Sequence, residues 1–195
     1  FLLDHGFYEV INSPFVNLSS GEVIKVDNPL DSNREYLRTN ITNSLVENLL
    51  YNERRQKDSI KIFEISDLYT KTNKINQEKK LGIIISGRQG HNYLDFSKKL
   101  DHAYLSNLFN QESDNSVFAI EEISRTELKT KKKDKIFYIE ISIDKIPEHI
   151  SKNLQSSSGQ INFIKYQSVS EFPSSTRDFS FSITDINKYI NLIPT

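Results

Sequence analysis

The side chains that could bind a metal ion or act as nucleophiles are scattered along this 195-residue chain. Its four histidines, at positions 5, 91, 102 and 149, show neither the HxH nor the HxxxH spacing that directs two imidazoles to one metal. Cysteine is absent, which excludes disulfides, thiolate metal sites and cysteine nucleophiles. Asp4 precedes His5, and Asp101 precedes His102, but adjacency does not orient a base towards a nucleophile. We therefore expect no metal site and no catalytic residue in this chain.

Two short motifs resemble sites for phosphate or for a shared proton. Residues 86–90 (SGRQG) supply two glycines and an arginine after an apolar run, without a GxxxxGK[ST] or GxGxxG pattern. A turn is the preferred interpretation, and a phosphate cradle is the alternative. Glu121 and Glu122 are neighbours in an expected strand, where successive side chains point to opposite faces. They are therefore not expected to share a proton or a metal ion.

Two basic features are candidates for contact with RNA. Residues 129–135 hold five lysines in seven positions, without the interleaved aromatic side chains on which single-strand binders commonly stack bases. A solvated loop is the preferred interpretation of this run, and an RNA contact is the alternative. Arg177 lies between two expected strands and beside Asp178. A structural ion pair and a phosphate contact both remain open for this arginine.

The composition describes a folded chain close to neutrality. Hydrophobic residues make up 36% and charged residues 26%, enough for a hydrophobic core. Lys and Arg number 25 against 26 Asp and Glu, so no global charge attracts nucleic acid or an anionic membrane. No apolar run approaches the roughly 20 residues of a membrane span. Phe, Tyr, Ile, Asn and Lys supply 81 of the 195 residues, as AT-rich codons would. Because the first residue is Phe, we expect a fragment of a longer chain.

A helix is predicted over residues 41–53, with Asn40 or Thr42 as its cap. Its apolar side chains recur at the spacing of one helical face: Ile41, Leu45, Val46, Leu49 and Leu50. Such a stripe suits either the core of the chain or a subunit interface, and the sequence leaves both open. A charge at Leu45 or Leu49 is therefore expected to disrupt folding or association.

The remaining pattern predicts an α+β fold with a mainly antiparallel sheet flanked by helices, because strand runs do not alternate regularly with helices. Residues 81–86 (LGIIIS) are expected to be buried on both faces, and the polar residues 70–80 are expected to form a loop. Strands are predicted over residues 7–16, 22–26, 60–69, 81–86, 117–123, 136–143, 160–170 and 179–183, and further helices over residues 97–111 and 185–190.

Several blocks of the sequence resemble, in order, the β subunit of phenylalanine–tRNA ligase. Near the start, residues 5–11 (HGFYEVI) and 15–16 (FV) are similar to its GF-EVI--SF opening. The next blocks are similar to its NPLS and MRTSLLPGLL segments: residues 28–32 (NPLDS), 37–40 (LRTN) and 44–50 (SLVENLL). Those further on are residues 62–69 (IFEISDLY), 136–146 and 172–181 (FPSSTRDFSF), similar to its FEIG, FE-x-DL and FP-x-x-x-RDLSF segments. The resemblance covers nearly the whole chain.

This resemblance implies a fold and a set of partners. Residues 1–170 would form a degenerate, non-catalytic copy of the class II synthetase catalytic module, and residues 171–195 would begin a C-terminal anticodon-binding-type, ferredoxin-like domain. The chain would assemble with the α subunit, which binds phenylalanine and ATP, in an (αβ)2 heterotetramer that positions tRNA(Phe), away from any membrane. ATP and Mg2+ would bind outside this chain. The implied interface residues are Leu37, Arg38, Ile41, Leu45 and Leu49, and the implied tRNA contact is Arg177.

The sequence also departs from this family. A short lysine-rich stretch stands where the family usually has a hairpin before the strand at residues 136–143. Such losses, together with the AT-rich composition, favour a plastid stroma, and the cytoplasm of an AT-rich bacterium is the alternative. A stand-alone protein- or RNA-binding α+β module is the alternative function. An independent ATP-dependent ligase would need a set of arginines and carboxylates that the sequence does not display.

Overall fold

The structure, a computed structural model, describes residues 1–17, 23–71, 74–90, 97–109, 118–128 and 130–146, with six single positions beyond them (166, 168, 172, 175, 177 and 182). The chain divides into two units, Phe1–Ser157 and Ser158–Thr195. Apart from those single positions, the elements predicted after residue 146 lie outside the described residues. The predicted division into residues 1–170 and 171–195 therefore stays a prediction.

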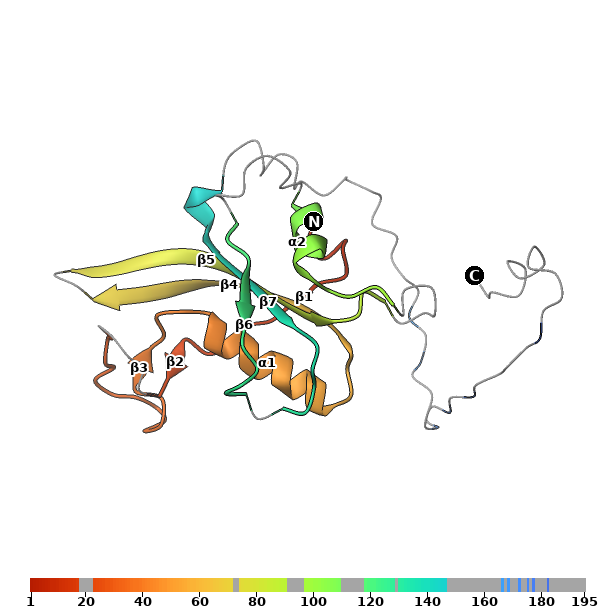
Figure 1. Cartoon of the computed structure of the whole chain (residues 1–195). Coiled ribbons are helices and arrows are strands. Elements are labelled where there is room, and N and C mark those ends of the chain that lie inside the picture. The colour runs from red at the N-terminus through yellow and green to blue at the C-terminus, as the bar shows by residue number, and fades with distance from the viewer. Residues whose placement is uncertain are drawn as a thin grey trace. The chain divides into compact units, whose positions relative to one another are not determined.

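A five-stranded sheet forms the centre of the first unit, in the order β1-β4-β5-β7-β6 (Figure 1). Its strands are β1 (Tyr8–Glu9), β4 (Ser59–Lys71), β5 (Ile75–Gly87), β6 (Glu121–Ile123) and β7 (Ile136–Ser142). The pairs β4–β5, β5–β7 and β6–β7 are antiparallel, whereas β1 pairs with β4 in parallel. The predicted α+β class is confirmed, and the sheet is mixed rather than purely antiparallel.

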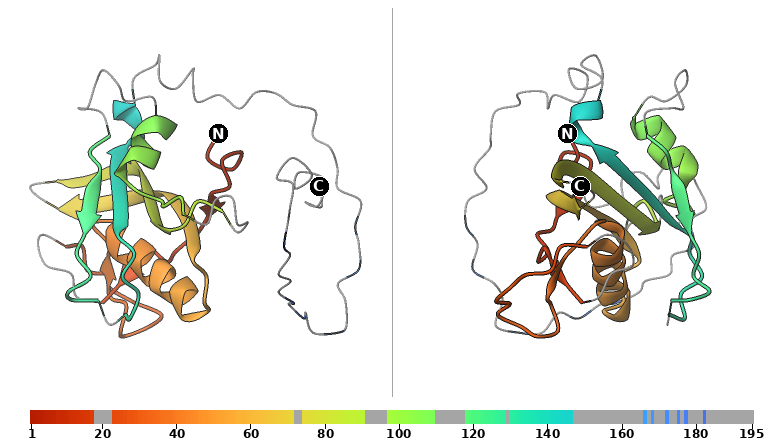
Figure 2. Two further views of the ribbon diagram at one scale, coloured as in Figure 1. Left: turned by 45° about the vertical axis from the view of Figure 1, so that its right-hand side comes forward. Right: turned by 90° about the vertical axis from the view of Figure 1, so that its left-hand side faces the viewer.

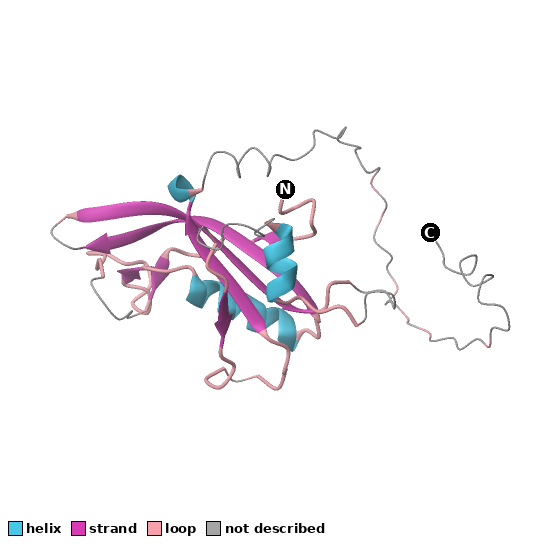
Figure 3. Ribbon diagram, turned by 45° about the horizontal axis from the view of Figure 1, so that its top comes forward, coloured by secondary structure: helices cyan, strands magenta, loops and turns pink. Residues whose placement is uncertain are grey.

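The hairpin of β4 and β5 is longer than predicted, and the loop expected over residues 70–80 is wrong. The ladder continues until Lys71 pairs with Ile75, and Figure 3 shows the two strands as one extended arm. The arm carries mainly polar side chains because its ladder is made by backbone groups, and beyond Leu68 its side chains are exposed or partly exposed. Cross-strand pairs such as Asp67 opposite Lys79 add charge complementarity along it.

Helix α1 (Thr42–Arg54) covers one face of the sheet, as Figure 2 shows. The residue that directly precedes the helix is Ile41, not the predicted Asn40 or Thr42, and it makes no side-chain cap; the side chain of Asn40 nevertheless accepts a hydrogen bond from the backbone N–H of Asn43 (3.3 Å) in the first turn. The apolar stripe of the helix packs against residues of β4, β5 and β7, which include Ile60, Ile62 and Ile84.

Helix α2 (His102–Leu108) belongs to a second apolar cluster, which includes Leu105 of α2 with Ile83 and Ile85 of β5. Because Ile84 belongs to the α1 cluster, alternate side chains of β5 enter two cores, and its apolar segment is buried on both faces as predicted. The helix predicted over residues 97–111 begins later, because Asp101 caps α2 by accepting a hydrogen bond from Tyr104 N (2.8 Å).

The predicted strand over residues 7–16 is divided by Pro14 and its polar neighbours. Only β1 and the short β2 (Phe15–Val16) form, and β2 pairs with β3 (Tyr36–Leu37) in a separate two-stranded sheet. Of the strand expected at residues 22–26, the described residues 23–26 form a single bridge, between Lys25 and Tyr36. A short 3-10 turn, η1 (Ile143–Lys145), follows β7. In the part of the chain that the structure describes, no helix is both long and apolar enough to cross a membrane.

Candidate functional site

Three of the five predicted interface residues belong to the core of the chain itself. Ile41, Leu45 and Leu49 are fully buried beneath α1. A Cβ atom placed on Gly82 of β5 would lie 2.9 Å from Ile41 Cγ2 and 3.0 Å from Leu45 Cδ1, so the helix rests almost directly on the strand backbone. The side chains of this stripe therefore face the sheet of the chain, while a subunit interface elsewhere on this segment stays a prediction.

Arg38, a fourth predicted interface residue, lies between β3 and α1 and is only 2% exposed. Its guanidinium group pairs with both carboxylate oxygens of Glu64 on β4; Nη1 donates to Oε2 at 3.3 Å, and Nη2 donates to Oε1. The same two nitrogens donate to Ser44 Oγ (3.1 Å) and Ser66 Oγ (2.5 Å). The positive charge of Arg38 is thus neutralised inside the chain, and the hydrogen bonds of its side chain connect the start of α1 to β4.

Glu64 also anchors the segment that follows β1. Its carboxylate accepts hydrogen bonds from the backbone N–H of Asn12 (3.3 Å) and from Asn12 Nδ2 (2.8 Å). Asn48 of α1 in turn donates to Asn12 Oδ1 (2.8 Å). One buried carboxylate therefore fixes three parts of the chain, and sequence reasoning missed it. The signal was a lone acidic residue within the apolar run IFEIS.

A groove of about 420 Å³ opens beside this anchor. Phe15 of β2 is 42% exposed there, and Leu30 is fully exposed in the turn that follows Pro29. The backbone N–H of Arg38 donates to Pro14 O (2.9 Å), so the groove is tied to the buried ion pair. Concave surfaces with exposed apolar side chains commonly contact other proteins. The groove is lined by Ser13, Phe15, Val26, Asn28, Pro29, Leu30, Asp31 and Arg34.

Leu37, the fifth predicted interface residue, is half-buried in β3 and lies opposite Phe15 in the β2–β3 ladder. Leu37 is therefore the predicted interface residue whose partner in the ladder, Phe15, lines the groove. Arg177, the predicted tRNA contact, is exposed, and Asp178 lies outside the described residues.

A second buried carboxylate lies at the end of α1. Glu53 is 8% exposed and accepts hydrogen bonds from Arg125 Nη1 (3.1 Å), Arg125 Nη2 (2.7 Å) and Thr130 Oγ1 (3.0 Å). Arg125 Nη2 also donates to Ser86 Oγ (2.9 Å), so the hydroxyl of the SGRQG motif has a structural partner. The cluster connects α1, β5 and the segment between β6 and β7, and sequence reasoning did not identify it.

A third carboxylate, Glu140 of β7, holds the start of α1. It accepts hydrogen bonds from Ile41 N (3.2 Å), Lys80 Nζ (3.0 Å) and the Tyr138 hydroxyl (2.6 Å). Burial, followed by the hydrogen bond to Glu140, raises the pKa of Tyr138 well above its ordinary value. Burial alone would lower the pKa of Lys80, but the carboxylates of Glu140 and Glu78 outweigh it and raise that pKa.

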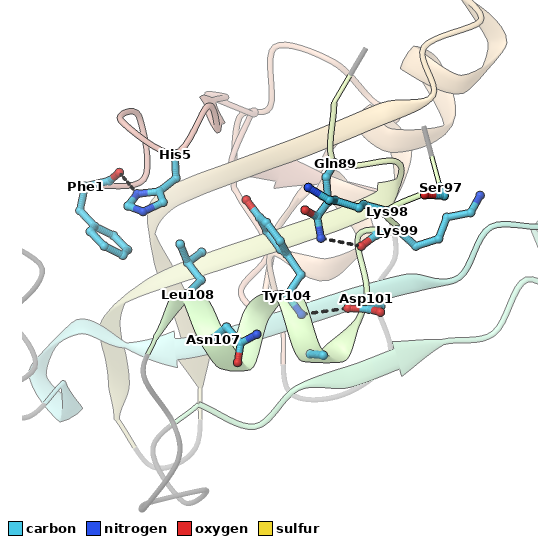
Figure 4. Close-up of a pocket in the computed structure, with 11 residues that line it drawn as sticks. Phe1, His5, Gln89, Ser97, Lys98, Lys99, Asp101, Tyr104, Asn107 and Leu108 are labelled. Carbon is cyan, nitrogen blue, oxygen red and sulfur yellow. Dashed lines mark hydrogen bonds between the residues drawn. The ribbon is translucent and has the colours of Figure 1, made fainter. Parts of the chain in front are cut away.

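A larger cavity, of about 800 Å³, lies between the N-terminal turn and α2 (Figure 4). Its polar groups serve the fold: His5 Nδ1 bonds to Phe1 O (3.0 Å), and Asp101 caps α2. Lys99 pairs with Asp134 (2.7 Å). The cavity is lined by Phe1, His5, Gln89, Ser97, Lys98, Lys99, Asp101, Ala103, Tyr104, Asn107 and Leu108.

Asp101 and His102, adjacent in the sequence, contact different partners in the structure. The Asp101 carboxylate caps α2, and His102 Nδ1 lies 3.2 Å from Ser106 Oγ. Glu122 pairs instead with Lys135 (2.8 Å). Within the described ranges, no three His, Cys, Asp or Glu side chains are grouped so as to hold a metal ion.

Comparison with known proteins places this geometry in a family context. The family model described as "Phenylalanyl tRNA synthetase beta chain CLM domain" matches residues 1–116. A phenylalanine–tRNA ligase beta subunit from Fusobacterium nucleatum is 32% identical over 109 residues, covering 50% of this chain and 14% of that relative. The corresponding subunit from Buchnera aphidicola is 25% identical over 224 aligned positions, covering 98% of this chain and 28% of that relative.

Among solved structures, a pyrrolysyl tRNA synthetase from Desulfitobacterium hafniense superposes with a TM-score of 0.47 at 15% identity. The superposition covers 73% of this chain and 62% of that chain.

Proposed function

The chain belongs to the phenylalanyl-tRNA synthetase beta chain family, and from this premise we propose that it is a segment of the β subunit of a phenylalanine–tRNA ligase. The family match over residues 1–116 includes α1, the hairpin of β4 and β5, and the groove beside Arg38. The chain spans 14% to 28% of the length of these curated relatives. The proposed activity of the whole ligase is the ATP-dependent attachment of phenylalanine to tRNA(Phe).

Within that ligase, we assign to this chain an architectural role. Polar side chains at the larger cavity make contacts that hold the fold together, as the Asp101 cap and the Lys99–Asp134 pair illustrate. Phenylalanine, ATP and Mg2+ are therefore proposed to bind in the α subunit. The chain would support the reaction by building an (αβ)2 assembly.

The groove between Phe15 and Leu30 is the proposed contact with α, and its exposed apolar lining is the observation that carries this proposal. It adjoins Leu37 and Arg38, which the family resemblance implicates in subunit contact. Because Ile41, Leu45 and Leu49 are buried in the core of this chain, we place the proposed contact with α on the strands next to the helix rather than on the helix itself. The anchor at Glu64 would keep the groove in a fixed position relative to α1.

Co-expression with the α subunit tests this assignment. The double substitution Phe15→Ser with Leu30→Asp removes apolar surface from the groove without touching a core residue. We expect it to abolish co-purification of α and to leave the thermal unfolding midpoint unchanged. Ile75→Ser, at an exposed apolar residue of the β4–β5 hairpin, is the matched control and should retain α.

Two outcomes would contradict the proposal. If the groove variant still co-purifies with α, the contact lies elsewhere on the chain. If the unaltered chain shows no affinity for α, the alternative of a stand-alone α+β module is favoured.

A further inference from the structure

A basic surface forms where the end of α1 meets the lysine-rich segment before β7. Residues 54–57 and 130–133 together contain six cationic side chains and no carboxylate. The two segments are in contact, because Lys132 Nζ donates to the backbone oxygen of Lys57 (3.3 Å). Apart from the half-buried Lys132, these cations are exposed. We call this surface the basic face; its cations are Arg54, Arg55, Lys57, Lys131, Lys132 and Lys133.

Two carboxylates next to the basic face, those of Glu53 and Asp134, are already paired with cations. A hollow of about 360 Å³ lies between Arg54, Lys131 and Lys132, and Glu53 is the acidic residue in its lining. Glu53 is held by both guanidinium nitrogens of Arg125 and by a hydroxyl, as described above. Asp134, which follows Lys133, pairs with Lys99.

The remaining cations of the basic face have no acidic partner among the residues that the structure describes: Arg54, Arg55, Lys57, Lys131 and Lys133. Like charges held close together repel one another, and a polyanion relieves that repulsion. In a chain whose formal net charge is −1, this concentration of positive charge is local to one face.

The fold also brings an aromatic side chain to this face, which the lysine run itself lacks. Tyr51 of α1 is 52% exposed, and the Arg55 guanidinium carbon lies 3.4 Å from the centroid of its ring. Arg55 Nη1 donates to Tyr51 O (3.2 Å), which holds the two side chains in place. Exposed aromatic rings and guanidinium planes are the surfaces on which proteins stack the bases of RNA.

We propose that the basic face binds RNA, with a backbone phosphate in the hollow between Arg54, Lys131 and Lys132 and a base stacked on the Tyr51–Arg55 pair. The stacked pair favours RNA over an acidic protein segment, because a carboxylate side chain has no ring to stack. The inference rests on the proposed function, since it assigns a contact for the tRNA of that ligase to this chain.

The test measures binding of fluorescently labelled tRNA(Phe) transcript to the full chain, purified alone and with α, over a range of salt concentrations. The variant combines Arg54→Glu, Lys131→Glu and Lys133→Glu, which leaves the Glu53–Arg125 cluster and Lys132 intact. We expect affinity to fall about tenfold or more, and the slope of log affinity against log salt to decrease by about two to three. The matched control reverses three exposed lysines at the far end of the β4–β5 hairpin: Lys71, Lys74 and Lys79.

A second variant tests the stacking step separately. Tyr51→Ala should weaken binding about fivefold or more at every salt concentration while leaving the salt slope unchanged, and Tyr51→Phe should restore the affinity. Circular dichroism confirms that each variant is folded before its affinity is compared.

The outcomes separate this inference from the proposed function. Equal tRNA affinity in the charge-reversal variant and its control overturns the RNA site. Displacement of tRNA by polyglutamate at equal charge concentration overturns it in favour of an acidic protein partner. Loss of tRNA affinity confined to the basic-face variants supports it, even if the unaltered chain fails to co-purify with α and thereby contradicts the assembly proposal.

Discussion

Arg38 and Glu64 form a bidentate ion pair in which each side chain is only 2% exposed. The arginine precedes α1, the glutamate lies in the middle of β4, and Ser44, Ser66 and Asn12 supply further hydrogen bonds. Arg38 Nε is buried and has no hydrogen-bond partner among the residues that the structure describes. Such a pair costs desolvation energy to form, so its net contribution to stability depends on the partners that it does have. The pair fixes where the β2–β3 sheet and α1 sit on the central sheet.

Removing one partner of this pair should destabilise the chain severely. Arg38→Met leaves the Glu64 carboxylate buried without its cation, which typically costs about 3–5 kcal/mol of the free energy of unfolding. Combining it with Glu64→Met should cost less than the sum of the two single substitutions, because no uncompensated charge remains. Urea denaturation of the four species gives the coupling energy. Lys135→Met, in the exposed pair with Glu122, is the control and should leave the midpoint unchanged. Additive effects would show that the two side chains do not interact.

Gly82→Ala should be destabilising although the residue lies in a strand, where alanine is normally no worse than glycine. The new methyl group would lie 2.9 Å from Ile41 Cγ2 and push α1 away from β5. Overpacking of this kind typically costs about 1–3 kcal/mol, measurable by urea denaturation. Ile41→Ala, which removes Cγ2, should cost less in the Gly82→Ala background than in the unaltered chain, because it makes room for the new methyl group. An increase in stability for Gly82→Ala would show that α1 is not seated on β5 as described.

Leu45→Asp and Leu49→Asp should prevent folding rather than merely weaken subunit association. Both side chains are fully buried against the sheet, and an unpaired carboxylate there would lose its hydration without compensation. Far-ultraviolet circular dichroism and gel filtration of the chain without α should therefore already show the defect. The groove variant at Phe15 and Leu30 provides the contrast, since it should fold and fail only in α binding. A folded Leu45→Asp chain would return the stripe to the list of interface candidates.

The Lys80–Glu140 pair should make stability depend on pH at the alkaline end. The pKa of Lys80 is raised in the folded chain, so the contribution of this pair is complete below the ordinary lysine pKa, about 10.4, and is lost as pH rises through the folded value. Lys80→Met should lower the free energy of unfolding by about 1 kcal/mol at neutral pH, and the difference from the unaltered chain should shrink as the pH rises through the folded pKa of Lys80. Urea titrations at successive pH values measure this, with the exposed neighbour Lys79→Met as the control. A difference that persists unchanged at high pH would assign the effect to packing.

The sequence is most informative where apolar spacing alone decides the structure. The stripe of α1 and the run LGIIIS are found as predicted, because burying those side chains leaves few alternatives. The polar arm of β4 and β5 is missed, because its ladder is held by backbone groups and leaves no apolar period to detect. The division of residues 7–16 at Pro14 could be foreseen from the sequence, because proline has no N–H to donate to a neighbouring strand.

The polar anchors are harder to predict, for a different physical reason. A buried carboxylate such as Glu64 can be suspected from its apolar neighbours, but its cation comes from another part of the chain, and seven arginines were available. Glu53 and Arg125 illustrate the same difficulty, since their pairing depends on the path of the segment between β6 and β7. The family resemblance drew attention to Arg38 but did not indicate that its side chain forms a buried ion pair within the chain. The plastid compartment stays a prediction.

The parallel strand β1 has a consequence for the order in which the chain folds. β4 and β5 are consecutive strands joined by a short connection, so their ladder can close early at little entropic cost. By contrast, Tyr8 must find Ile62 across a long intervening segment that contains the β2–β3 sheet and all of α1. Since contacts between distant positions form slowly, we expect the hairpin and α1 to form first and the N-terminal strand to be added later. During refolding, the edge of β4 that faces β1 should therefore gain its strand partner after the edge that faces β5.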